Sequence, residues 1–166
     1  MKYKLVKLSQ FSGKKASIYS VIINNDGITL LDKFLIKNNN LFISETKDIL
    51  MRLRSMGSQT GAREQFFKID EGSLGDGVCA LYDSPGSNLR LYCIKFGTQI
   101  IVVGGGGHKP KSIKAFQEDE NLKNENYFLR QLSNQLSERI KSKEITFTND
   151  YLDFSGNLEF EDSEDE

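Results

Sequence analysis

Four consecutive glycines are followed at once by basic residues, and this stretch holds the side chains best suited to chemistry. Residues 104–107 precede His108, Lys109, Lys111 and Lys114. Imidazole titrates near neutral pH and can move protons, and ammonium groups bind phosphate oxygens. The stretch predicts contact with a phosphate-bearing partner. The alternative is a flexible glycine turn followed by solvated lysines.

Two other kinds of site do not fit this sequence. A phosphate-binding P-loop needs a glycine before its lysine and a Ser or Thr after it, whereas His108 and Pro110 flank Lys109. The chain holds one histidine and two cysteines, Cys79 and Cys93. That inventory is too small for a zinc centre or a disulfide framework. We therefore expect no metal and no cofactor.

An apolar β-hairpin has to position the glycine run. Residues 89–96 and 99–103 are rich in β-branched, aromatic and aliphatic side chains, and Gly97-Thr98 between them fits a two-residue type II′ turn. Both strands are apolar on both faces, which predicts a central pair, and the glycines are expected to end the pairing. Alternation predicts that one face carries Arg90, Tyr92, Ile94 and Phe96.

The rest of the pattern predicts an α+β domain. KYKLVKL and SIYSVII are typical strands, LLDKFL has helical spacing, and Ser44 is placed to cap a second helix. QFFKI and VCALY precede the hairpin as extended segments, and a last helix is expected from about 124 to 143. We expect an antiparallel central sheet packed by two N-terminal helices and one C-terminal helix.

The formal net charge of −1 hides an asymmetry. Residues 1–143 hold all 22 lysines and arginines and 14 of the 23 acidic residues, a net charge of +8. This basic domain predicts a polyanionic partner, of which nucleic acid is the commonest. Residues 144–158 are expected to form an extension with a further hairpin. Residues 159–166 are expected to be an acidic tail, either disordered or folded back onto the basic surface.

The order of these elements resembles the RelE/ParE/HigB superfamily of toxin–antitoxin toxins, closest to the branch of phage-derived host-killing proteins and HigB. The similar segments are AREQFFKIDEG, VCALY, LRLYCIKFG and GGGGHKPKSIKAFQED, within residues 17–140. The resemblance implies a small RelE-like fold and a cytoplasmic bacterial toxin. Its partners would be a cognate helix-turn-helix antitoxin and mRNA, often on the ribosome. No membrane partner is expected, because no stretch approaches 18 apolar residues.

The resemblance also implies roles for individual residues in a metal-independent cleavage, in which a ribose 2′-hydroxyl attacks the adjacent phosphate. Arg63 and Arg90 would bind the scissile phosphate. His108 would transfer protons, and Lys109 would stabilise negative charge. RNA-binding roles are implied for Lys68, Tyr92, Lys111 and Lys114.

Structural alternatives remain for these residues. Arg63 also fits a helix exit that pairs with Glu64 or Asp70. Lys68 also fits a position that faces solvent, and Tyr92 also fits the core. Arg90 also fits a salt bridge with Asp83, and His108 fits an ordinary loop position. At the level of the whole chain, the alternatives are a ParE-like gyrase inhibitor without catalysis and a non-toxic binding module. The four glycines and the acidic residues at 118–120 depart from the plainly basic end of ribonuclease toxins.

Overall fold

The structure is a computed structural model that describes residues 1–69, 71–72, 75–81, 86–109 and 120–162. The main sheet contains β1 (Lys2–Lys7), β2 (Ser17–Ile23), β3 (Phe67–Lys68), β4 (Val78–Leu81), β5 (Leu89–Phe96), β6 (Ile100–His108) and β9 (Glu159–Glu161). The other elements are α1 (Leu30–Asn38), α2 (Ile43–Ser55), the π-helical turn η1 (Met56–Thr60), the 3₁₀ turn η2 (Glu64–Phe66), α3 (Glu120–Ser142), β7 (Ile145–Phe147) and β8 (Phe154–Gly156).

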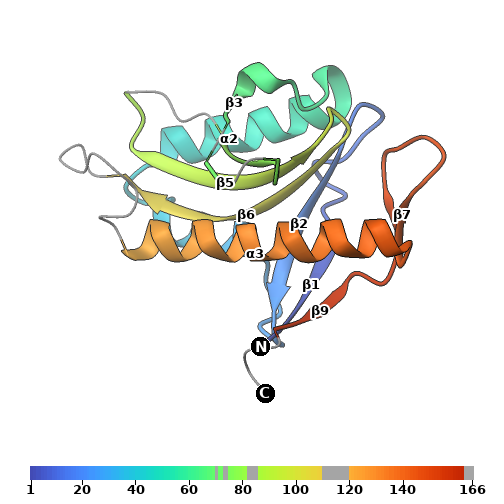
Figure 1. The fold of residues 1–166 in the computed structure, drawn as a ribbon. Helices are drawn as coiled ribbons and strands as arrows, with labels where there is room; N and C mark the ends of the chain where they lie inside the picture. The colour runs from blue at the N-terminus through green and yellow to red at the C-terminus, as the bar shows by residue number, and fades with distance from the viewer. Residues whose placement is uncertain (70, 73–74, 82–85, 110–119, 163–166) are drawn as a thin grey trace.

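Within these residues the chain is α+β, with a mostly antiparallel sheet, as the sequence predicted. The strand order is β3-β4-β5-β6-β2-β1-β9, and β7 pairs with β8 in a separate hairpin. The pair β2 and β6 runs parallel, whereas its neighbours are antiparallel. In Figure 1 the long helix α3 crosses one face of the sheet and α2 lies behind the other. None of the described helices is long and apolar enough to cross a membrane.

Two apolar layers hold the helices to the sheet. α3 buries Leu122, Leu129, Leu132 and Leu136 against one face, where they meet side chains such as Tyr92, Ile94 and Val102. α1 and α2 bury Leu31, Phe34, Ile49 and Leu53 against the other face, where they meet Leu91, Cys93, Ile101 and Val103. The alternation predicted for β5 is therefore confirmed, because its odd and even residues divide between the two cores.

The two N-terminal helices begin in different ways. Thr29 caps α1 with a capping box: its hydroxyl accepts from the Asp32 amide at 3.1 Å, and the Asp32 carboxylate accepts from the Thr29 amide at 3.2 Å. The prediction that Ser44 caps α2 is wrong, because α2 already begins at Ile43 after Phe42 and has no side-chain cap.

The β5–β6 hairpin is present, but two details predicted for it are wrong. Phe96 pairs with Ile100, so the turn has three residues and not two. The glycine run does not end the pairing, since Gly106 and Gly107 pair with Leu91 and Arg90 inside β6. Instead the register shifts between Leu91 and Cys93. This β-bulge absorbs one extra residue of β6 while the ladder continues.

The C-terminal extension is part of the same core. β7 and β8 form the expected further hairpin and bury Ile145 and Phe154. The expectation of an acidic tail from residue 159 is corrected, because β9 pairs with β1 and places Phe160 opposite Tyr3. The two rings stack with centroids 5.6 Å apart, so one buried aromatic side chain anchors an otherwise acidic strand. Residues 163–166 lie outside the described residues.

Candidate functional site

Three of the predicted site residues lie on the sheet face that α3 covers. Arg90 and Tyr92 are 7% and 0% exposed. Lys68 lies in the same cross-strand row as Tyr92, because Lys68 pairs with Ala80 and Ala80 pairs with Tyr92. Directly opposed residues in a sheet point to the same face. Because Arg90 is almost fully buried, a substrate phosphate reaches its guanidinium only if the groups that cover it move.

Polar residues that sequence reasoning missed fasten α3 to the β3–β4 edge of this face. The Asn126 side chain donates to the Glu71 carbonyl at 2.7 Å, and Ser133 donates to the Asp76 carbonyl. Glu71 also forms a 3.3 Å ion pair with Lys68. Asn126 and Ser133 are buried. In the sequence, the one sign that these two polar residues are buried is their helical spacing, which places them in line with the apolar stripe of α3.

His108 belongs to the opposite side of the sheet, and Lys109 follows directly after the end of β6. His108 pairs with Leu89, whose side chain joins the α1/α2 core, and its ring lies 5.0 Å from that of Phe42 at the start of α2. The Lys109 amide donates to the Asn88 carbonyl at 2.7 Å. These contacts place His108 beside α2, away from the face that carries Arg90.

Glu45 of α2 holds this end of the hairpin in place. Its two carboxylate oxygens accept from the amide and the side chain of Asn88, both at 2.8 Å, and one of them also accepts from the Leu89 amide at 3.1 Å. The start of β5, and with it the backbone of Lys109, is thereby fixed to α2.

The β-bulge explains why His108 and Arg90 are separated. Without the register shift, His108 would pair with Asn88, which has the same parity along β5 as Arg90. With the shift, Arg90 pairs with Gly107 and His108 pairs with Leu89. A one-residue slip sends every later side chain to the other face. The catalytic grouping that the resemblance implied is therefore not assembled in this structure.

Arg63 lies at the far end of the hairpin and is exposed. The preceding residue, Ala62, donates its amide to the carbonyl of Thr98 in the hairpin turn at 2.8 Å. Arg90 precedes Phe96, the last residue of β5, by six positions, which is roughly 20 Å along an extended strand. Lys111 and Lys114 lie outside the described residues.

A crevice opens where β2 and β6 part. None of the predicted site residues lines it. The two strands pair from Ser17–Ser20 to Ile100–Val103 and then diverge, β2 continuing beside β1 and β6 beside β5. The crevice has a volume of about 70 Å³. It is lined by Leu30, Lys33, Phe34, Lys37, Gly105, Gly106, Asn121 and Glu125.

Glu125 dominates the electrostatics of this crevice. Burial raises the pKa of its carboxyl group, and the positive charges of Lys37 and Lys33 oppose that rise. The carboxylate lies directly over Gly105, where an added Cβ would overlap its Oε2 atom. Asn121 donates to the Gly106 carbonyl at 3.1 Å. The bare glycine strand thus makes room for a carboxylate between α1 and α3.

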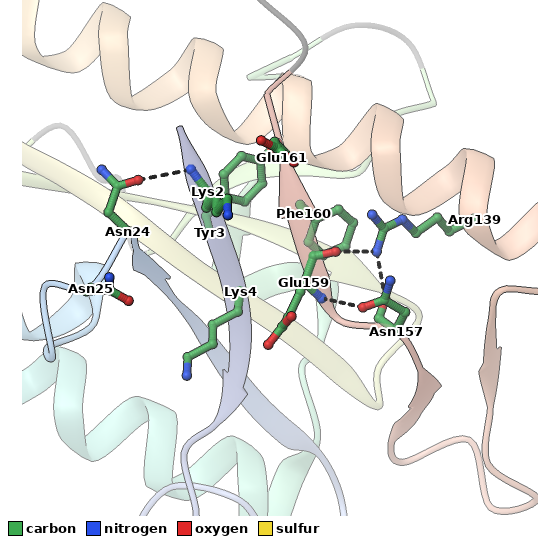
Figure 2. A pocket seen from close by; sticks show the side chains of 10 residues that line it. All are labelled: Lys2, Tyr3, Lys4, Asn24, Asn25, Arg139, Asn157, Glu159, Phe160 and Glu161. Carbon is green, nitrogen blue, oxygen red and sulfur yellow. Dashed lines mark hydrogen bonds between the residues drawn. The ribbon is translucent and has the colours of Figure 1, made fainter. Parts of the chain in front are cut away.

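A larger cavity of about 510 Å³ lies at the β1–β9 edge (Figure 2). Arg139 donates to the carbonyls of Asn157 at 2.8 Å and Glu159 at 2.6 Å, and its guanidinium lies 4.0 Å from the Phe160 ring centroid. Two lysines of β1 face two glutamates of β9 across the pairing. The Arg139 contacts fasten β9 to α3, and none of the predicted site residues lines the cavity.

Comparison with known proteins finds no match to this chain among protein-family profiles, curated proteins or solved structures.

Proposed function

We propose that the chain is the toxin of a bacterial toxin–antitoxin pair, with a RelE-like domain that cleaves mRNA in the cytoplasm without a metal ion. The observation that supports this most is the shared face of Lys68, Arg90 and Tyr92 on the antiparallel half of the sheet. Cationic and phenolic groups on one face of a rigid sheet suit a phosphate that gains negative charge.

In this proposal the 2′-hydroxyl of a ribose attacks the adjacent phosphorus, and the bond from phosphorus to the 5′-oxygen breaks. Arg90 neutralises charge on the phosphate, and Lys68 and Tyr92 position the chain. His108, on the other side of the sheet, and Lys109, just after the end of β6, contact RNA that runs past the strand end. The groups that cover Arg90 have to shift before RNA reaches it, because the side chain is almost fully buried. The cognate antitoxin is the partner expected to keep the toxin inactive.

Induced expression in a bacterial host tests the proposal, with growth and the 5′ ends of a reporter mRNA followed together. The unaltered chain and Lys141→Ala, an exposed change at the far end of α3, should arrest growth and create new 5′ ends. Lys68→Ala and Arg90→Gln should do neither while remaining folded by circular dichroism. Normal growth with abundant folded protein would refute a toxin of any kind.

A second candidate, a ParE-like inhibitor that binds DNA gyrase without catalysis, is favoured by one observation. Arg90 and His108 lie on opposite faces, and Arg90 and Tyr92 are buried, which is a poor arrangement for chemistry on one phosphate. Growth arrest with intact mRNA, together with inhibition of gyrase supercoiling by the purified chain, would support this candidate over the ribonuclease.

A further inference from the structure

We infer that the crevice between β2 and β6 binds the sugar–phosphate backbone of RNA, with Lys37 at a phosphate and Glu125 accepting a hydrogen bond from a ribose hydroxyl. The inference rests on the proposed function as an RNA-binding toxin. It adds a contact site whose residues lie outside the set predicted from the sequence.

The fork in the sheet creates the crevice. Within the described residues β2 and β6 are the one parallel pair. Leu31 and Phe34 of α1, the helix after β2, pack in the core on one face, and α3, the helix after β6, packs in the core on the other. Both strands continue beyond their last paired residues, and because each then pairs only with its other neighbour, a space opens beside Gly105 and Gly106. Ser20 closes the apex, because its hydroxyl donates to the Val103 carbonyl at 2.8 Å and accepts from the Leu31 amide at 3.3 Å.

Glu125 supplies an acceptor inside the fork. In the part of the chain that the structure describes, its carboxylate has neither a hydrogen bond nor a salt bridge, although burial raises the pKa of the group. Glu125 is only partly buried, so a ligand can reach its carboxylate, and a hydroxyl is a donor that binds it without adding charge. Gly105 leaves the carboxylate open to the strand, since any Cβ there would overlap it.

Lys37 supplies the positive charge for a phosphate. Both α1 lysines act on Glu125, and Lys37 acts more strongly. Lys33 is already held by Asp26 at 2.5 Å, whereas Lys37 is exposed in the last turn of α1. A space of about 70 Å³ admits a hydroxyl or one phosphate edge and leaves a base outside. The contact is therefore to the backbone and carries no sequence preference.

The crevice is next to the predicted basic residues at the end of β6. The Phe42 ring contacts His108, and the Phe42 amide donates to the Asn38 carbonyl at 3.0 Å, one residue after Lys37. Lys37, His108 and Lys109 thus lie along one edge of the molecule. An RNA strand that follows this edge passes the mouth of the crevice, and its phosphates meet Lys37 together with the basic residues at the end of β6.

Fluorescence anisotropy tests the inference. It compares the affinity of the full chain for one short single-stranded RNA with its affinity for the DNA of matching sequence. The unaltered chain should prefer RNA, because DNA lacks the 2′-hydroxyl. Glu125→Gln should weaken RNA binding by about tenfold, the loss expected for a hydrogen bond to a charged group, and leave DNA binding unchanged. A gel shows whether the RNA stays intact during the measurement. The series is repeated in a chain that carries Lys68→Ala, the change expected to prevent cleavage.

Lys37→Ala is the second variant. Because Lys37 is exposed, this change should leave the protein folded. It should weaken RNA and DNA equally and reduce the slope of log affinity against log salt by about 0.7, whereas the control Lys141→Ala should change neither. An unchanged RNA-to-DNA ratio in Glu125→Gln, or equal effects of Lys37→Ala and Lys141→Ala, would overturn the inference alone. If the unaltered chain binds no RNA, the proposed function fails with it.

Discussion

Gly104→Ala should destabilise the protein because the glycine run makes room for α3. None of the four glycines has a positive φ, so alanine can adopt the backbone of this strand. A Cβ at Gly104, however, would lie 2.7–2.8 Å from three side-chain carbons of Leu129. Overpacking of this kind lowers the free energy of unfolding by about 1–3 kcal/mol. The loss should disappear when the Leu129 side chain is shortened.

Leu129→Ala alone removes a fully buried side chain and should lower the free energy of unfolding by about 2–5 kcal/mol. In the double variant, the new methyl group at position 104 occupies part of the space that Leu129 leaves. The loss of unfolding free energy in the double variant should therefore be smaller than the sum of the two single losses, by about 1 kcal/mol or more.

Urea unfolding of the four proteins measures this coupling, provided that the slope of free energy against urea stays constant. Leu136→Ala is the matched control, since Leu136 is also fully buried on α3 but is not among the nearest neighbours of Gly104. Its effect should add to that of Gly104→Ala. A coupling below about 0.5 kcal/mol between Gly104 and Leu129 would refute the steric explanation of the glycine run.

Three further predictions concern the C-terminal strand, the cysteines and the crevice. Phe160→Ala should lower the free energy of unfolding by about 3–5 kcal/mol, as seen in thermal melts, because Phe160 anchors β9. A thiol reagent at pH 8 should modify Cys79 and Cys93 only after unfolding, because burial raises the pKa of both thiols, that of Cys79 to about 12. Glu125→Gln should stabilise the fold at neutral pH. The gain should fade as the pH drops below the ordinary range of a carboxyl group, because there the glutamate is neutral in both the folded and the unfolded state.

Each of these predictions has a clear contrary result. A melt of Phe160→Ala that matches the wild type would mean that β9 adds nothing to the core. Rapid labelling of the cysteines in the folded protein would contradict their burial. A Glu125→Gln variant that is less stable at neutral pH would show that the carboxylate has a favourable partner in the folded state.

Elements with a strong local pattern were predictable from the sequence. The two faces of β5 follow directly from the alternation of its side chains, and the stripe on α3 follows from its helical spacing. The extent of the C-terminal core was harder to predict, because β9 depends on one aromatic residue, Phe160, and on a pairing partner near the other end of the chain, Tyr3. Local composition around Phe160 is acidic and therefore favours a tail.

The arrangement of the candidate site was not predictable, for a geometric reason. Sequence spacing places Arg90 and His108 on the two strands of one hairpin, but the side to which His108 points depends on the bulge opposite Tyr92. The bulge lies where α3 packs against the glycines, which is a contact between segments far apart in sequence. The crevice at Glu125 needs the same long-range packing together with the divergence of β2 from β6.

The most direct test of the proposed function is the chemistry of the cleavage products. Purified chain incubated with a labelled RNA in the presence of EDTA should produce fragments with 2′,3′-cyclic phosphate and 5′-hydroxyl ends, since the 2′-hydroxyl is the nucleophile and no metal takes part. Products with 5′-phosphate ends, or cleavage that EDTA abolishes, would contradict the proposed mechanism. The absence of any cleavage by folded protein, both of the free RNA and of mRNA in translating ribosomes, would contradict the ribonuclease function itself.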